Sequence, residues 1–183
     1  MTFAVARSRD EAHLYLDLHP CDDCGSVETT WDNAVAVIDG ELANRYTGTC
    51  EGCGKKREFW FGLPEKEIIP EEYPTFGGPE PSQLLDAGQW RWVADIITAD
   101  LPEDDPHEAR RSLAVARAAV EEVMKFIPPG EDAVPDGAFW SEQGREVYAA
   151  EPSRFTIDRL LAARTAYRDQ AKGYPDEKAP ERD

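Results

Sequence analysis

The spacing of hydrophobic positions changes twice along the chain. Near the N-terminus, Ala12, Tyr15 and Leu16 recur at the spacing of one helical face. Over 27–61, runs of β-branched and aromatic residues separated by turn residues are typical of strands. From Ser82 onward the helical spacing returns. The pattern predicts an α+β protein, in which a short helix and an antiparallel sheet precede an α-helical subdomain.

Residues that can cap helices mark where the helices begin. The patterns predict helices over 9–18, 106–127 and 141–148, another that Ser82 can cap and that runs to about 98, and a last one that Ser153 or Thr156 can cap and that runs to about 171. The helix over 106–127 has the strongest signal, because Asp105 can cap it and Pro106 suits its first turn. Apolar residues then follow at steps of three and four up to Ile127, where two prolines end the pattern.

A dipeptide between two strand-like runs predicts a hairpin. Asp39-Gly40 separates the runs 34–38 and 42–49, and this pair is favoured where both central residues of a two-residue turn need positive φ. Residues 59–61 offer a third strand. We therefore expect a small antiparallel sheet here.

The cysteines form two copies of the motif C-x-x-C-G, and the 25 residues between Cys24 and Cys50 include this hairpin. The four residues are Cys21, Cys24, Cys50 and Cys53. Two cysteines three apart on a tight turn direct their sulfurs at one centre, and the following glycine lets the chain reverse. A hairpin brings both turns together, so that four thiolates can surround one Zn²⁺ tetrahedrally. We expect one zinc ion per chain.

With these motifs, residues 19–61 resemble the zinc-ribbon family. The resemblance implies two zinc knuckles on a three-stranded antiparallel sheet and covers about a quarter of the chain. It implies a metal but no particular function, because zinc ribbons occur in nucleic-acid binders, enzyme appendages and interaction modules alike.

Two other uses of the cysteines are less favoured. A redox pair needs a lowered thiol pKa from nearby cations or a helix N-terminus, whereas Asp22, Asp23 and Glu51 lie between these cysteines. A catalytic zinc keeps an open position for water, which four cysteine ligands do not leave. We therefore expect a structural zinc.

The chain also has no G-x-S-x-G, H-E-x-x-H or P-loop pattern, so we expect no enzyme.

The net charge of the chain limits the class of partner that we expect it to bind. With 37 acidic and 20 basic residues the formal net charge is −17, the wrong sign for a protein that mainly follows a phosphate backbone. We expect an acidic protein-interaction module that binds a protein with a basic surface, for example as an inhibitor, an immunity-type or a regulatory protein. No apolar run reaches the roughly 18 residues of a membrane span, and no secretory signal is visible, so the expected location is cytoplasmic.

One small basic cluster supports an alternative function. Arg45, Lys55, Lys56 and Arg57 could contact phosphates, with Trp31 or Trp60 as stacking partners for bases. The chain would then be a nucleic-acid-associated zinc-ribbon regulator. These cations could equally offset the negative charge of a four-thiolate zinc site, which is the interpretation we favour.

The histidines and tryptophans add weaker signals. His19 could hydrogen-bond near the metal site, whereas His13 and His107 are expected at the surface or the edge of the core. Trp90 and Trp92 lie two apart on a predicted helix, so they cannot share one narrow buried face.

The predicted organisation follows from these patterns. It comprises an N-terminal helix (1–18), a zinc ribbon (19–61), a Pro/Glu-rich linker (62–81), a helical subdomain (82–172) and a flexible tail (173–183).

Overall fold

The computed structural model describes residues 3–66 and 73–175. The chain forms two compact units, of which one comprises Met1–Glu71 and Thr75–Leu84 and the other comprises Glu72–Pro74 and Leu85–Asp183. The first unit contains a three-stranded antiparallel sheet and the second contains helices, which confirms the predicted α+β class. The predicted linker and tail lie partly outside the described residues, and the predicted domain boundaries stay predictions.

The sheet of the first unit follows the chain order. Its strands are β1 (Thr29–Ile38), β2 (Glu41–Cys50) and β3 (Lys56–Gly62), with β2 in the middle. Asp39 has a φ of 50° and Gly40 a φ of 84°. Positive φ at both positions is what the two-residue hairpin turn requires, so the predicted hairpin is confirmed.

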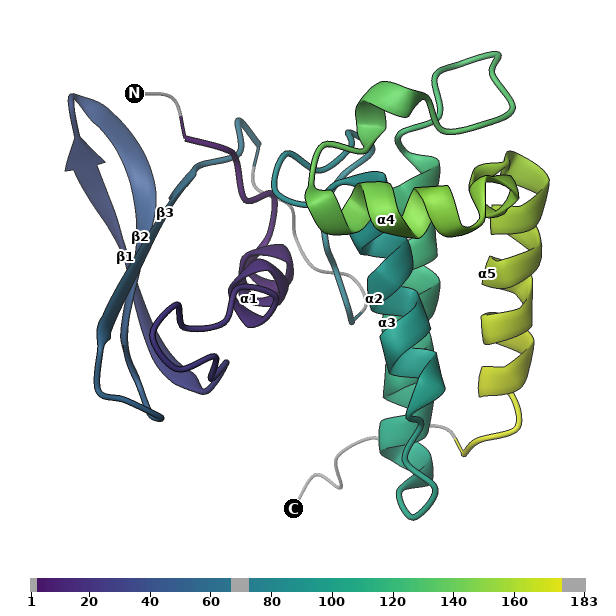
Figure 1. Ribbon diagram of the computed structural model, residues 1–183, viewed down its shortest axis with the longest axis horizontal. Helices are drawn as coiled ribbons and strands as arrows, with labels where there is room; N and C mark the ends of the chain where they lie inside the picture. The colour runs from purple at the N-terminus through teal and green to yellow at the C-terminus, as the bar shows by residue number, and fades with distance from the viewer. Residues whose placement is uncertain (1–2, 67–72, 176–183) are drawn as a thin grey trace. The chain divides into compact units, whose positions relative to one another are not determined.

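Helix α1 (Arg9–Asp17) covers one face of this sheet (Figure 1). The Ser8 side chain caps it by accepting a hydrogen bond from the Glu11 N–H. Tyr15 meets the Phe61 ring edge to face at 5.5 Å, and Phe61 meets Tyr46 in the same way at 5.6 Å. The core of the first unit therefore lies between α1 and one sheet face.

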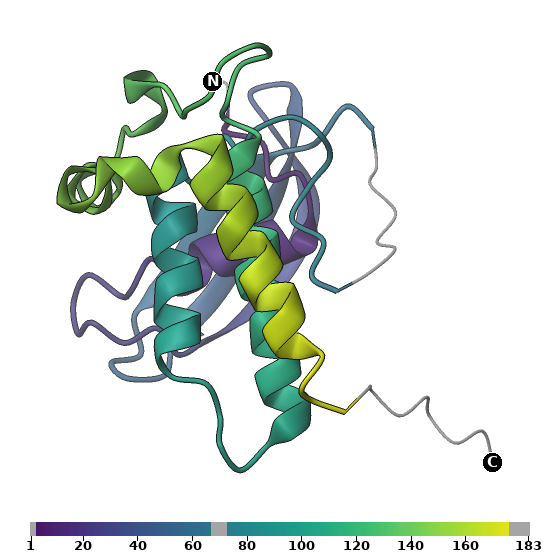
Figure 2. The ribbon, with the colours of Figure 1, turned by 90° about the vertical axis from the view of Figure 1, so that its right-hand side faces the viewer.

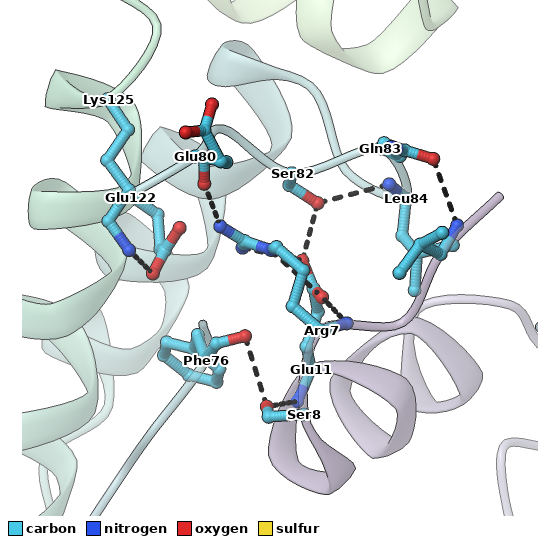
Figure 3. A network of polar contacts seen from close by, with 11 residues as sticks. Arg7, Ser8, Glu11, Phe76, Glu80, Ser82, Gln83, Leu84, Glu122 and Lys125 are labelled. Atoms are coloured by element: carbon cyan, nitrogen blue, oxygen red, sulfur yellow. Dashed lines mark hydrogen bonds and ion pairs between the residues drawn. The ribbon is translucent and has the colours of Figure 1, made fainter. Parts of the chain in front are cut away.

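A buried ion pair between Arg7 and Glu11 is hydrogen-bonded to residues near the other end of the first unit (Figure 3). The Arg7 guanidinium donates from Nη2 to Glu11 Oε1 at 2.6 Å and from Nε to both carboxylate oxygens. Glu11 has no exposed surface, and it also accepts from the Ser82 hydroxyl at 2.6 Å. Arg7 Nη1 donates to the Glu80 carbonyl. Residues 75–84 are thereby tied to α1 by hydrogen bonds.

The second unit is built from helices that lie side by side. They are α2 (Ala87–Ala99), α3 (Pro106–Met124), α4 (Glu142–Ala150) and α5 (Ile157–Ala171), with short 3₁₀ turns at Asp136–Ala138 (η1) and Pro152–Phe155 (η2). Figures 1 and 2 show α3 beside both α2 and α5, while α4 crosses one end of α2. Apolar side chains of α2 and α3, among them Trp90, Leu113 and Val120, are fully buried.

Two helix boundaries differ from the prediction by three residues or more. Helix α2 begins at Ala87 and not at Ser82, because Asp86 caps it and completes a capping box with Gln89. Helix α3 ends at Met124, three residues before Ile127. Residues 125–127 continue the chain in tighter turns, each N–H bonding to the carbonyl three residues earlier.

The tryptophans on α2 separate as expected for positions two apart. Trp90 is fully buried and Trp92 is half-buried, whereas Trp140 is 45% exposed.

None of the described helices has the length and apolar character needed to cross a membrane.

Candidate metal centre

Two turns of the same geometry carry the cysteines. In each, the glycine N–H donates to the carbonyl of the first cysteine, from Gly25 to Cys21 at 2.7 Å and from Gly54 to Cys50 at 2.8 Å. Gly25 and Gly54 have φ values of 74° and 75°, which side-chain-bearing residues rarely adopt. The glycine of each motif thus lets the chain reverse directly after the cysteine pair.

The sheet brings the two turns to the same end. Cys50 is the last residue of β2, and β1 pairs with β2 so that Thr29 lies opposite Cys50. The turn that precedes β1 therefore meets the turn between β2 and β3. The four Sγ atoms all lie within 4.8 Å of one another, with Cys21 to Cys53 at 3.7 Å and Cys24 to Cys50 at 3.5 Å.

These separations suit a tetrahedral metal site. Metal–sulfur bonds of about 2.3 Å place the sulfurs of a tetrahedral zinc centre about 3.8 Å apart. Cys21 and Cys50 are buried, whereas Cys24 and Cys53 are exposed at the rim. The four cysteines are thus a cluster that could hold a metal ion, and four sulfur ligands would leave no position for a substrate or water.

The thiols perturb one another because they are so close. Burial raises the pKa of Cys50, but the Cys53 N–H and the Cys24 thiol outweigh it and lower this pKa to about 7. At Cys53 the Lys55 N–H lowers the pKa, but the neighbouring thiols, Cys24 foremost, and burial raise it to about 12. The protein alone thus stabilises one thiolate at the expense of another, and a bound cation would favour all four.

Arg57, one of the four candidate nucleic-acid-binding cations, is buried inside the first unit. Its guanidinium donates to the His19 carbonyl and to the Thr29 hydroxyl, and lies 5.0 Å from the centre of the Trp31 ring. Gly48 lies opposite Arg57 in the sheet, and a side chain there would collide with Thr29. Arg57 therefore locks the strands together beside the cysteine cluster.

Two other candidate cations form ion pairs at the surface. Lys55 Nζ lies 2.8 Å from Asp23 Oδ1, between the two cysteine turns. Arg45 donates from Nε and Nη2 to Glu58 Oε2, at 2.9 and 2.5 Å. Lys56 is exposed and has no ion pair among the described residues. The sequence analysis grouped these four cations as one cluster. In the structure, Arg57 is buried, Lys55 and Arg45 form surface ion pairs, and Lys56 is exposed.

The sheet face opposite α1 is hollowed into an open groove of about 680 Å³. The charged residues that line it are Asp32, Glu51, Glu58, Arg45, Lys56 and Arg57, but the Arg57 guanidinium points to the opposite sheet face, toward Thr29 and Trp31. The remaining three acidic and two basic side chains give the groove a formal charge of −1. The groove therefore lacks the positive excess with which proteins attract a phosphate backbone.

The histidines do not contact the cysteine sulfurs among the described hydrogen bonds. His19 lies 2.6 Å from the Tyr15 carbonyl through Nδ1, and its ring stacks on Tyr15 at 3.8 Å. His13 meets the Tyr46 ring edge to face at 5.7 Å. Both therefore support the packing of α1 on the sheet.

The sequence analysis did not identify Asp23 as the partner of Lys55 or Glu58 as the partner of Arg45. Asp23 lies 32 positions from Lys55 and Glu58 lies 13 from Arg45, so no local pattern joins either pair. The strand register would have suggested the second pair, because Thr47 lies opposite Glu58 and shares its face with Arg45.

No protein-family model, curated protein or solved structure matches this chain.

Proposed function

We propose that the chain is a zinc-stabilised, non-enzymatic module that binds a protein partner carrying a basic surface. The proposal rests first on the four-cysteine cluster, whose spacing suits a tetrahedral ion. Four thiolates in tetrahedral arrangement favour zinc over the harder cations magnesium and calcium, which prefer oxygen. With its coordination complete, such a zinc would hold the two turns together and would not activate water.

The charge of the chain supports the choice of partner. The formal net charge is −17, and Arg57 and Lys55 are already engaged within the first unit. An acidic surface attracts proteins with a basic face and increases their rate of association at low salt. The same surface repels nucleic acid, which makes the nucleic-acid-associated regulator the less supported alternative.

Metal analysis tests the zinc centre. We expect one zinc equivalent per purified chain, together with a loss of thermal stability after chelation. The variant Cys53→Ser should lose the metal, whereas Ser26→Ala, directly after the other cysteine turn, should retain it. Well below one equivalent, with no change of stability on chelation, would count against the centre.

Affinity capture tests the partner class. The zinc-loaded chain, immobilised and exposed to nuclease-treated lysate at low and at high ionic strength, should retain basic proteins only at low ionic strength. A gel-shift titration with duplex and single-stranded oligonucleotides provides the contrasting arm. Salt-sensitive oligonucleotide binding that disappears in a Lys55/Lys56 charge-reversal variant would favour the regulator instead.

A further inference from the structure

A second groove, of about 370 Å³, lies in the helical unit. Its walls come from α2, the η2 turn and α5, and it carries three arginines, Arg91, Arg154 and Arg159. On α5, small alanine side chains line it between these charges: Ala162, Ala163 and Ala166. Its volume is at the lower end of the range of small-molecule sites.

Arg91 is buried there with its hydrogen bonding incomplete. Only 8% of its surface is exposed, and its Nη1 lies 3.2 Å from the Tyr167 hydroxyl and 3.4 Å from Asp95 Oδ1. Among the described residues, its buried Nε has no hydrogen-bond partner, and both of its polar contacts are made by Nη1. Nε and Nη2 form the parallel pair of donors that a carboxylate binds in bidentate fashion. A buried guanidinium nitrogen without a hydrogen-bond partner is uncommon in a protein.

The other two arginines extend the positive charge across the groove. Arg154 Nη2 lies 2.5 Å from Asp95 Oδ1, the same oxygen that Arg91 approaches. Arg159 is exposed and has no ion pair within the described part of the chain. Glu151 also lines the groove, 3.9 Å from Arg154.

The charges in the groove do not cancel. Three guanidinium groups face the two carboxylates of Asp95 and Glu151, which leaves one positive charge. This excess matches one carboxylate better than a phosphate monoester, whose charge at neutral pH is close to −2. The alanine wall offers an apolar surface for the body of the ligand.

We propose that this groove binds a small organic carboxylate, whose carboxylate group is held by Arg91 and Arg159 while its apolar body lies on Ala162, Ala163 and Ala166. The site belongs to the helical unit and does not depend on the zinc centre. An arginine cluster in a chain of net charge −17 gives this unit a recognition chemistry opposite to that of the surface as a whole.

Two probes with the same apolar body separate carboxylate from phosphate recognition. The zinc-loaded full chain is titrated with sodium benzoate and, separately, with phenyl phosphate, and amide shifts are followed by NMR. We expect saturable shifts centred on η2 and the first half of α5, with a benzoate dissociation constant on the order of a millimolar, as suits so small a ligand. Stronger binding of phenyl phosphate would overturn the assignment to carboxylates.

Matched variants on α5 test the residues. Arg159→Gln should weaken benzoate binding about tenfold, the loss expected for one charge-assisted hydrogen bond. Arg168→Gln removes the same charge from the same helix outside the groove and should bind benzoate as the unmodified chain does. Equal weakening in both variants would show only general attraction to positive charge, and would overturn the proposal.

A third variant tests the groove itself without changing charge. Ala166 is exposed, so Ala166→Leu should leave the fold intact while its larger side chain occupies part of the apolar wall. We expect benzoate binding to fall at least as much as in Arg159→Gln. Unchanged binding in this variant, or no saturable shift with either probe in the unmodified chain, would refute the site.

Discussion

At the scale of single residues, the contribution of an ion pair to the stability of this protein depends on whether the pair is buried or exposed. Glu11 has no exposed surface and receives hydrogen bonds from Arg7 and Ser82, whereas Glu58 and its partner Arg45 are each more than 40% exposed. Water and salt screen an exposed pair, so that it contributes little to stability. Breaking a buried pair instead leaves an uncompensated charge in the interior.

We therefore predict that Glu11→Gln destabilises the protein strongly. The amide keeps the volume of the carboxylate but leaves the Arg7 charge unbalanced, which should lower the free energy of unfolding by about 3 kcal/mol. The control Glu58→Gln should leave it nearly unchanged. Urea unfolding of the zinc-loaded proteins, followed by near-ultraviolet circular dichroism, measures both. Similar losses in the two variants would mean that burial does not set the contribution of these pairs.

At the scale of elements, two glycines allow α2 and α4 to cross closely. A Cβ atom built on Gly88 would lie 2.3 Å from the Gly144 carbonyl oxygen. A Cβ on Gly144 would lie 2.0 Å from Asp86 Oδ1. The Asp86 carboxylate caps α2 and also accepts from the Ser141 N–H that begins α4. One buried carboxylate thus aligns the starts of both helices.

Because the two helices cross so closely, adding a single methyl group at the crossing should strongly reduce stability. Gly144→Ala should lower the free energy of unfolding of the helical unit by about 2 kcal/mol, because the backbone of α4 must move away from Asp86. Gly137→Ala is the matched control, since a Cβ atom at Gly137 meets no atom within 4 Å. Thermal unfolding followed by circular dichroism compares the two. A Gly144→Ala protein as stable as the control would show that the crossing has room to adjust.

At the scale of the whole molecule, the two compact units have different sources of stability. The helical unit buries large apolar side chains such as Trp90, Phe155 and Leu160. The sheet of the first unit is only three strands wide, and the cysteine cluster closes one of its ends. Metal binding to such a site supplies folding free energy, so removal of the metal should affect the first unit most.

We predict that Cys50→Ser unfolds the sheet locally and leaves the helices in place. The variant should lose zinc and the near-ultraviolet signal of the sheet aromatics, while most of the helical circular dichroism persists. Chelation of zinc from the unmodified chain should have the same effect and serves as the control. If the helical signal disappeared as well, the two units would unfold as one cooperative structure.

The sequence by itself determined the features that depend on neighbours in the chain. The Asp39-Gly40 turn, the two C-x-x-C-G turns and the start of α3 at Pro106 were all predictable. Each depends on backbone conformations or caps that a few adjacent residues specify. The clustering of the cysteines follows almost directly, because a hairpin must bring the two turns together.

Only the tertiary structure decided which charged residues are available for binding. The sequence suggested Arg57 as a phosphate contact, but its guanidinium lies 5.0 Å from the centre of the Trp31 ring. Arg91 meets Tyr167, which is 76 positions away. Asp86, which caps α2, has a local partner in Gln89 and a second partner, Ser141, that is 55 positions distant. The charge of a side chain does not specify whether it is buried or which residue it contacts, because both are set by the packing of segments that are distant in the sequence. The cysteine cluster was therefore visible in the sequence, and the arginine groove was not.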